Sequence, residues 1–345
     1  MPSSPTPPTS SQPPGPATIA DVARVAGVST ATVSRALRDH PYVAAETRRK
    51  VLDAVSRLRY VANPNASRLA SGSTGTIGLI APVLTSWYTS EVVAGVEEVL
   101  SEAERDLLIG SARTQQRESM FRGDIQFHQR VDGIILVDVF CSEEGAGRLS
   151  AMGIPVVVLG ERLHSVTSVA VDNAAGAALA AGHLVSTGHR DIALVEGQSH
   201  IDLAHNVPTE RAAGFLGELR RHGLDLDPRL RADGGFSISG GRAAMHRLLD
   251  EPQRPTAVFL MNDEMAFGAL QALRERGLRP GHDIAVVGFD DHPVAESVGL
   301  SSVRQQVREI GRTGARLMME RLDGEGTVRH VAAPLELVVR ESSRR

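Results

Sequence analysis

The stretch DVARVAGVSTATVSRAL, residues 21–37, carries small polar and basic side chains at helical spacing. Val33 and Leu37 share one face of its second half, which leaves a different face outward. That outward face holds Thr30, Ala31, Ser34 and Arg35. An arginine can donate two hydrogen bonds to guanine O6 and N7, and the methyl of a threonine or alanine can contact the thymine methyl. These side chains are therefore suited to reading base edges in the major groove of DNA.

Neighbouring residues are suited to phosphate contacts, which position a protein on the duplex without reading its sequence. They are Ser29, the cluster Arg48, Arg49 and Lys50, and also Ser34. Residues 1–72 hold nine Arg/Lys and four Asp/Glu, whereas the remaining 273 residues hold 28 and 37. A basic front on an acidic body indicates a module that binds a polyanion. The alternatives are a purely structural helical hairpin and a chance scatter of charge.

A second group of polar residues follows apolar strand patterns further along the chain. Arg211 begins a helical pattern, where a guanidinium can clamp hydroxyl groups or a carboxylate. Asn262 ends one strand pattern, and Asp290 ends another. Polar groups at the carboxyl ends of strands are suited to holding a small ligand. Asp263 and Asp291 stand beside them and are alternatively helix caps, which we favour for Asp263.

The elements that position the DNA-facing residues are predicted to be three short helices within residues 18–62. Thr18 is suited to cap the first helix, with Asp21 three residues later. Gly27 is suited to end that helix with a positive φ, and Ser29 to cap the next. Two short helices joined this tightly are typical of a helix-turn-helix, whose second helix enters the major groove.

From residue 76 onward, near-continuous apolar strands alternate with helical patterns. The candidate strands are TIGLIAP, DLLIG, VDGIILV, IPVVVLG, SVAVD, DIALVEG, TAVFLM and DIAVVGFD. This alternation predicts an α/β fold with parallel sheets covered on both faces, and eight or so strands favour two lobes over one large sheet. Two facing lobes would form a cleft at the strand ends. Residues 1–17, rich in Pro, Ser and Thr, are expected to be a disordered leader.

Several protein classes are disfavoured. Cys141 is the one cysteine, so neither a disulfide framework nor a cysteine-based zinc site is expected. No apolar run approaches the ~18 residues of a membrane span, and the start of the chain lacks a signal-peptide pattern, so we expect a cytoplasmic protein. GxSxG and HExxH motifs are absent, and GSTGTIG lacks the Lys-Ser/Thr of a phosphate-binding loop. We therefore predict no enzyme, no cofactor and no metal; an exported solute-binding protein is the other alternative.

Residues 18–82, TIADVARVAGVSTATVSRALRDHPYVAAETRRKVLDAVSRLRYVANPNASRLASGSTGTIGLIAP, resemble without a gap the N-terminus of LacI/GalR-family transcriptional regulators. The resemblance extends to about residue 342. It implies base readout by Thr30, Ala31 and Arg35, followed by a hinge and two doubly wound lobes of periplasmic-binding-protein type. The boundaries it implies are a hinge over 63–75, a first lobe at about 76–173 and 304–331, and a second at about 174–303 and 332–345. Ala44 departs from the family, which usually has a serine cap on the third helix.

The resemblance implies a hinge helix in which Leu69 wedges into the minor groove. Asn63 and Pro64 make a suitable helix start, and Ala66 shares a face with Leu69. So short a segment cannot hold a helix alone and is expected to fold only against a partner. The family's usual proline is Ala62 here, and its arginine is shifted by one place to Arg68. An ordinary linker is the alternative.

The resemblance also implies effector contacts by Arg211, Asn262 and Asp290, and by the loop PVLTSWYTSE, which includes Thr85, Ser86, Trp87 and Tyr88. Trp87 is the only tryptophan, and an aromatic ring beside hydroxyl-binding groups suggests a stacked sugar. A packed loop or an interface anchor is the alternative for Trp87. Many relatives place an acid where Gly160 stands, and Glu161 is adjacent. A nucleobase or another metabolite stays open as the effector.

These features together predict a repressor that binds a pseudo-palindromic operator as a homodimer, because two-fold DNA mirrors a two-fold protein. The resemblance implies subunit contacts by the apolar faces of residues 91–104 and 264–277. An effector between the lobes would alter the spacing of the paired hinges. The sequence leaves open whether the effector releases DNA or promotes its binding. A DNA-binding protein without a small-molecule sensor is a further alternative.

Overall fold

The computed structural model describes residues 17–37, 40–60, 73–112, 130–139, 143–197, 207–325 and 327–344. The chain divides into two units, Met1–Thr74 and Gly75–Arg345, which are considered separately. The predicted leader, apart from Ala17, lies outside the described residues. So do the predicted hinge residues Asn63, Ala66 and Leu69.

The described part of the first unit is a bundle of three helices, α1 (Ile19–Ala26), α2 (Thr30–Leu37) and α3 (Ala45–Leu58). The predicted caps are confirmed. Thr18 and Asp21 form a reciprocal capping box at the start of α1, and Gly27 ends α1 with a φ of 69°. Val22, Val33 and Val51, one from each helix, are fully buried together in the core. Ala44 makes no side-chain capping bond to α3, as its departure from serine implies.

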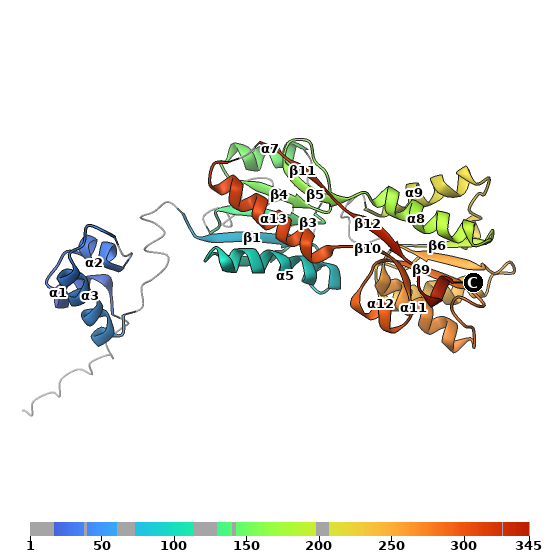
Figure 1. The fold of residues 1–345 in the computed structure, drawn as a ribbon, viewed down its shortest axis with the longest axis horizontal. Helices are drawn as coiled ribbons and strands as arrows, with labels where there is room; N and C mark the ends of the chain where they lie inside the picture. The colour runs from blue at the N-terminus through green and yellow to red at the C-terminus, as the bar shows by residue number, and fades with distance from the viewer. Residues whose placement is uncertain are drawn as a thin grey trace, which may run out of the picture. The chain divides into compact units, whose positions relative to one another are not determined.

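The second unit contains two six-stranded sheets, one in each lobe (Figure 1). The first sheet has the order β11-β5-β4-β3-β1-β2, and all its paired strands are parallel. The second has the order β12-β10-β9-β8-β6-β7 and is parallel except for the β10–β12 pair. The strands of the first sheet are β1 (Thr76–Ala81), β2 (Asp106–Ser111), β3 (Gly133–Val137), β4 (Val156–Leu159), β5 (Thr167–Val171) and β11 (His330–Ala333). Those of the second are β6 (Ile192–Glu196), β7 (Arg231–Asp233), β8 (Ala257–Leu260), β9 (Ala285–Asp290), β10 (Ser301–Gln305) and β12 (Leu335–Val338).

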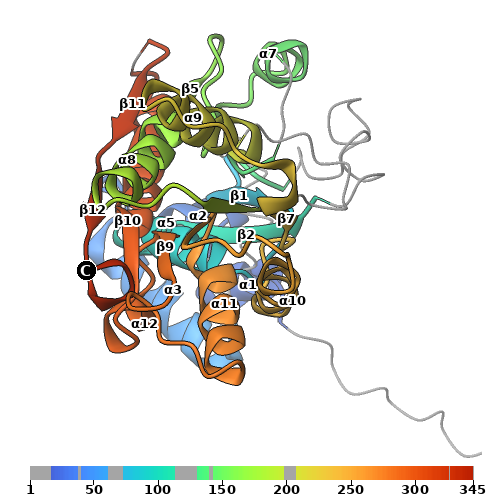
Figure 2. The same ribbon diagram turned by 90° about the vertical axis from the view of Figure 1, so that its right-hand side faces the viewer.

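Helices cover both faces of each sheet (Figures 1 and 2). In the first lobe α5 and α13 pack on one face and α7 on the other. In the second lobe α8 and α9 lie together on one face, and α10 and α11 on the other. Their bounds are α5 (Trp87–Glu102), α7 (Glu143–Ala151), α8 (Asn173–Ser186), α9 (Val207–Arg221), α10 (Ile238–Leu249), α11 (Asp263–Glu275), α12 (Pro293–Ser297) and α13 (Val307–Leu322). Two short 3-10 turns occupy Pro228–Leu230 and Glu341–Ser343.

Glycine allows the covering helices to approach closely. A Cβ on Gly95 of α5 would overlap the backbone carbonyl of Arg308 in α13, and one on Gly311 of α13 would overlap the carbonyl of Val92. On the second lobe, a Cβ on Gly214 of α9 would overlap the backbone of Ala174 in α8. These helix pairs are therefore in backbone contact, which fixes their spacing more rigidly than side-chain packing does.

The chain passes between the sheets three times. It leaves the first sheet after β5, returns to it after β10, and leaves it again between β11 and β12, where Pro334 alone separates the two strands. Gln305 and Ala333 still belong to strands of the sheet being left, two residues beyond the corresponding predicted boundaries. Three chain crossings therefore join the two lobes. The first lobe contributes the carboxyl ends of β1 and β3, and the second contributes those of β6, β8 and β9.

Candidate functional site

The outward face predicted for α2 is present in the structure. Thr30, Ala31 and Arg35 are exposed, and Ser34 is half-buried. Ser29 caps the helix, because its hydroxyl accepts a hydrogen bond from the backbone N–H of Thr32 at 3.2 Å. The side chains suited to base contacts therefore stand on one rigid surface of the bundle.

The basic cluster divides into two kinds of residue. Arg48 is half-buried and donates from Nη2 to the carbonyl of His40 at 2.9 Å, so it holds the connection between α2 and α3. Arg49 and Lys50 are exposed, and Lys50 pairs with Glu46 at 3.0 Å. Phosphate contacts by this cluster stay a prediction, and the sequence did not indicate the internal hydrogen bond of Arg48.

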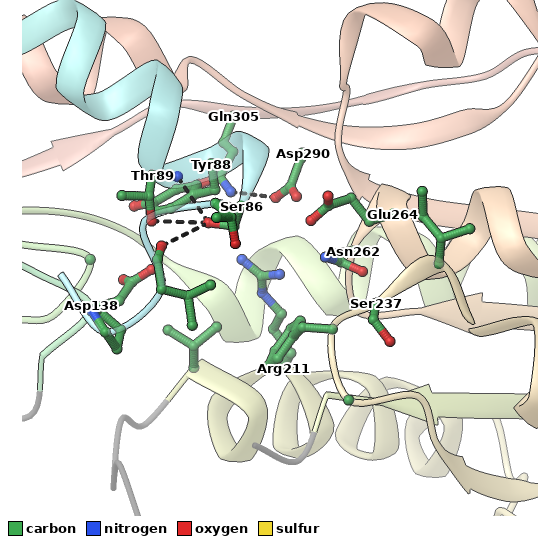
Figure 3. Close-up of a pocket in the computed structure, with 18 of the residues that line it drawn as sticks. Ser86, Tyr88, Thr89, Asp138, Arg211, Ser237, Asn262, Glu264, Asp290 and Gln305 are labelled. Atoms are coloured by element: carbon green, nitrogen blue, oxygen red, sulfur yellow. Dashed lines mark hydrogen bonds between the residues drawn. The ribbon is translucent and has the colours of Figure 1, made fainter. Parts of the chain in front are cut away.

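A cavity of about 930 Å³ lies between the two lobes of the second unit (Figure 3). Its wall includes six of the seven residues predicted to contact an effector. They are Thr85, Ser86, Tyr88, Arg211, Asn262 and Asp290. The first three come from the first lobe and the last three from the second, so a ligand in the cavity would contact both lobes.

Arg211, on α9, is the buried cation of this cavity. Its Nε donates to the Asn173 side chain at 2.9 Å, and its Nη1 donates to the carbonyl of Met261. Its guanidinium carbon lies 3.6 Å from the centre of the Phe289 ring, in a cation–π contact. These contacts fix its direction toward the centre of the cavity (Figure 3). Burial lowers the pKa of Arg211, and Asp290 and Asp138 counteract this.

Asp290 is held in an unusual backbone conformation at the carboxyl end of β9. Its φ is 116°, and the next residue, Asp291, has a φ of 57°. Arg304 and Arg340 anchor the Asp291 carboxylate at 2.6 and 2.7 Å. Gln305 donates to the Asp290 carboxylate at 2.6 Å. Burial raises the pKa of Asp290 to about 7, although Arg211 partly opposes the shift.

The predicted helix cap at Asp263 is wrong. Asn262 caps α11, since its side-chain oxygen accepts from the Met265 N–H at 2.9 Å. Asp263 is fully buried and accepts from the His292 N–H at 2.8 Å and from the Ser302 hydroxyl at 2.7 Å. It therefore ties α11 to the loop after β9. Asp291 is likewise an ion-pair residue, and His292 caps the following helix, α12.

The position predicted for Trp87 is also wrong. Ser86 caps α5, so Trp87 and Tyr88 lie in the first turn of that helix and not in a loop. The Trp87 ring packs 4.7 Å from the ring of His292, and Trp87 is not part of the cavity wall. The structure thus favours the alternative of a packing residue. Among the described residues, the aromatic side chains that line the cavity are those of Tyr88 and Phe236, and Phe236 has a φ of 51°.

Asp138 is a cavity residue that the sequence analysis missed. It directly follows β3, has a φ of 47°, and is half-buried. Its carboxylate occupies the space that a Cβ on Gly160 would enter, so it lies where many family members were expected to place an acid. Burial raises its pKa to about 7, with Arg211 opposing the shift. Its position at the end of an apolar strand was the available signal. Glu264, Gln305 and Phe236 were missed as well.

The described part of the chain offers neither a membrane-spanning helix nor a metal site. None of its helices is long and apolar enough to cross a membrane. None of its groups of His, Cys, Asp and Glu side chains is arranged to hold a metal ion.

Comparisons with known proteins match both units. Residues 18–63 match the family described as bacterial regulatory proteins, lacI family, and residues 181–343 match a periplasmic binding protein-like domain. The HTH-type transcriptional repressor PurR of Erwinia tasmaniensis is 36% identical over 315 residues, which cover 89% of this chain and 90% of the relative.

Solved structures show the same arrangement of elements. The lac repressor dimer bound to operator and the anti-inducer ONPF has a TM-score of 0.84 at 28% identity, covering 96% of this chain and 100% of that one. The complex of the transcriptional regulator CelR with cellobiose has a TM-score of 0.68 at 32% identity, covering 94% and 99%. The predicted family, and the fold of a helix-turn-helix unit with two parallel-sheet lobes, are confirmed.

Proposed function

Because the chain belongs to the LacI family of bacterial regulatory proteins, we propose that it is a transcriptional repressor controlled by a small effector. It binds a pseudo-palindromic operator as a homodimer, with one α2 helix in each half-site. The cavity between the lobes holds the effector. The proposed target of the protein is bacterial DNA, so its place of action is the cytoplasm. The proposed activity of the protein is binding, which agrees with relatives that are named as transcriptional regulators.

The observation that carries the proposal is the composition of the cavity wall. Thr85, Ser86 and Tyr88 from one lobe face Arg211, Asn262 and Asp290 from the other. A ligand that contacts both sets changes the free-energy difference between open and closed lobes, because it binds the two arrangements unequally. Coupling of ~1–3 kcal/mol is typical of such linkage and changes occupancy 5- to 150-fold. We propose a sugar as the effector, in line with the cellobiose named for CelR.

The test is selection of bound sequences from random duplexes with the full chain, followed by an effector screen on the recovered operator. We expect a two-fold symmetric site and at least one small molecule that changes its affinity. The direction of that change distinguishes release from corepression, including by a nucleobase. No preference for any duplex over genomic competitor DNA would contradict the proposal.

Replacing Arg35 by alanine is expected to weaken specific binding by ~1–3 kcal/mol per subunit and to relax base preference at one position of each half-site. The reason is that Arg35 is the exposed arginine of α2, and its guanidinium can pair with guanine. The measurement is fluorescence anisotropy on the selected operator and its single-base variants. The control is Arg49→Ala, which is expected to weaken binding to all sequences alike. Equal selectivity for Arg35→Ala and the wild type would reject this assignment.

Leu69→Ala is expected to reduce the bend of the bound operator without changing the unfolding midpoint of the protein. The proposed wedge partly unstacks a central base step, at a cost of a few kcal/mol that the bend returns through extra contacts. Circular-permutation gel shifts or end-to-end energy transfer on labelled operator would measure the bend. An unaltered bend angle counts against the wedge.

A further inference from the structure

The effector cavity has a surplus of hydrogen-bond acceptors. Asp138, Glu264 and Asp290 all line it. Among the described residues, none donates a hydrogen bond to the carboxylate of Asp138 or Glu264, and Asp290 accepts one, from Gln305. A carboxylate offers about four lone-pair sites. The wall therefore presents many acceptor sites for donors that a ligand would supply.

The described part of the wall holds two arginines, Arg211 and Arg242, and Arg242 is paired with a carboxylate. Arg242 donates from Nε to both carboxylate oxygens of Glu275 at 3.0 Å, so its charge is paired away from the ligand. Arg211 is directed by Asn173 and Met261, and its single positive charge faces three carboxylates. Among the residues that the structure describes, the ionised wall carries three negative charges, of Asp138, Glu264 and Asp290, against the one positive charge of Arg211 that no carboxylate pairs. An anionic ligand would add to this imbalance.

Helix N-termini are the other common anion-binding groups. At the cavity, those of α5, α10 and α11 are capped by side chains, whereas Gln306 makes no side-chain capping bond at the start of α13. Ser86, Ser237 and Asn262 all belong to the wall. Each accepts a hydrogen bond from the first turn of its own helix, from Thr89 N at 3.2 Å, Gly240 N at 3.1 Å and Met265 N at 2.9 Å. The N–H groups that would bind a phosphate are thus partly used within the chain.

We propose that the effector is a small molecule rich in hydrogen-bond donors that carries no anionic group, namely an uncharged polyol or its amine-bearing form. Hydroxyl or ammonium groups satisfy Asp138, Glu264 and Asp290, whereas phosphorylated and carboxylated ligands are rejected by the same carboxylates. Amine-bearing ligands bind at least as well as their uncharged parents. This inference rests on the proposed function only in that it takes the cavity as the effector site.

The test uses the full chain and a matched panel of hexoses and pentoses, each as the parent sugar, the amino sugar, the sugar phosphate and the uronic acid. Binding is measured by calorimetry at pH 8, above the pKa of about 7 of Asp138 and Asp290, and its loss in Asn262→Ala assigns it to the cavity. We expect the phosphate and uronate of any binding sugar to bind at least tenfold more weakly than the parent. A smaller loss, or a panel in which no parent or amino sugar binds, overturns the proposal.

The double variant Asp138→Asn, Glu264→Gln tests the physical cause. We expect it to reduce the ratio of parent to phosphate affinity by more than half, because two of the three repelling charges are removed while that of Asp290 remains. Asp225→Asn, a fully exposed site outside the cavity, is the matched control and leaves the ratio unchanged. An unchanged ratio in a double variant with a normal unfolding midpoint overturns the proposal.

The two proposals fail separately. A chain that selects an operator but takes an anionic effector loses this inference and keeps the proposed function. A chain that binds uncharged sugars but no specific duplex loses the proposed function and keeps this inference.

Discussion

Asp290→Asn is expected to stabilise the Gly75–Arg345 unit at pH 8 by roughly 2 kcal/mol, and to do so much less at pH 5. Asp290 is buried, with 6% of its surface exposed, and burial raises its pKa to about 7. An unfolded aspartate has a pKa near 3.9, so between these two values the folded state binds more protons. Ionisation of Asp290 therefore costs the folded state nothing at low pH, and it lowers the free energy of unfolding progressively as the pH rises toward 7. Asparagine removes this loss.

Urea unfolding at pH 5 and pH 8 measures the effect on the free energy of unfolding, with Asp225→Asn as the exposed control. A gain of the same size at both pH values would show that ionisation of Asp290 is not its source. The same variant, and Asp290→Ala, are also expected to abolish the effector response while operator affinity without effector stays near that of the wild type. A variant that still responds removes Asp290 from the site. If the effector response is lost and the stability gain is seen, Asp290 is a residue kept for binding at a cost in stability.

Gly95→Ala is expected to lower the free energy of unfolding of the second unit by about 3 kcal/mol, at the upper end of typical overpacking costs. The added methyl group would overlap the carbonyl oxygen of Arg308, a backbone atom that cannot rotate away. Helices α5 and α13 would have to separate, which would also strain the ion pair of Arg312 with Glu98 that lies between them at 2.6 Å. Thermal or urea unfolding measures the loss.

Gly217→Ala on α9 is the matched control. A Cβ at this position meets nothing within 4 Å, so the substitution should stabilise the unit by about 0.5–1 kcal/mol through helix propensity alone. Equal effects of the two substitutions would contradict the close helix contact.

Much of the fold was predictable because the central strands are short apolar runs. The sequences of β1, β3, β4, β8 and β9 are buried on both faces and were all identified as strands. Four strands were missed. β7, with the sequence RAD, and β10, with SSVRQ, are too short or too polar to show a strand pattern. β11 (HVAA) and β12 (LELV) lie at sheet edges, are partly exposed and are separated only by Pro334, so no stretch of turn residues marks them as two strands.

Site residues were predictable where their type and their position at the end of a strand pattern indicate a role. They were less predictable where the role depends on tertiary contacts. Arg211, Asn262 and Asp290 were identified and do meet in one cavity. Trp87 was misplaced because the start of α5 depends on the Ser86 cap, and its packing depends on His292, which lies 205 residues away in the chain. Asp138 was missed because its role depends on the positive φ and on the absence of a side chain at Gly160.

The adjacency of β11 and β12 has a consequence for biosynthesis. These two strands complete different sheets and are separated only by Pro334. During translation neither lobe can close its edge until this stretch has left the ribosome, whereas the contacts of α1, α2 and α3 are local and available early. A premature stop codon shortly before His330 would leave the three-helix bundle intact and open an edge on both sheets at once. Late truncations are therefore expected to yield chains that aggregate through these edges while retaining a folded N-terminal unit.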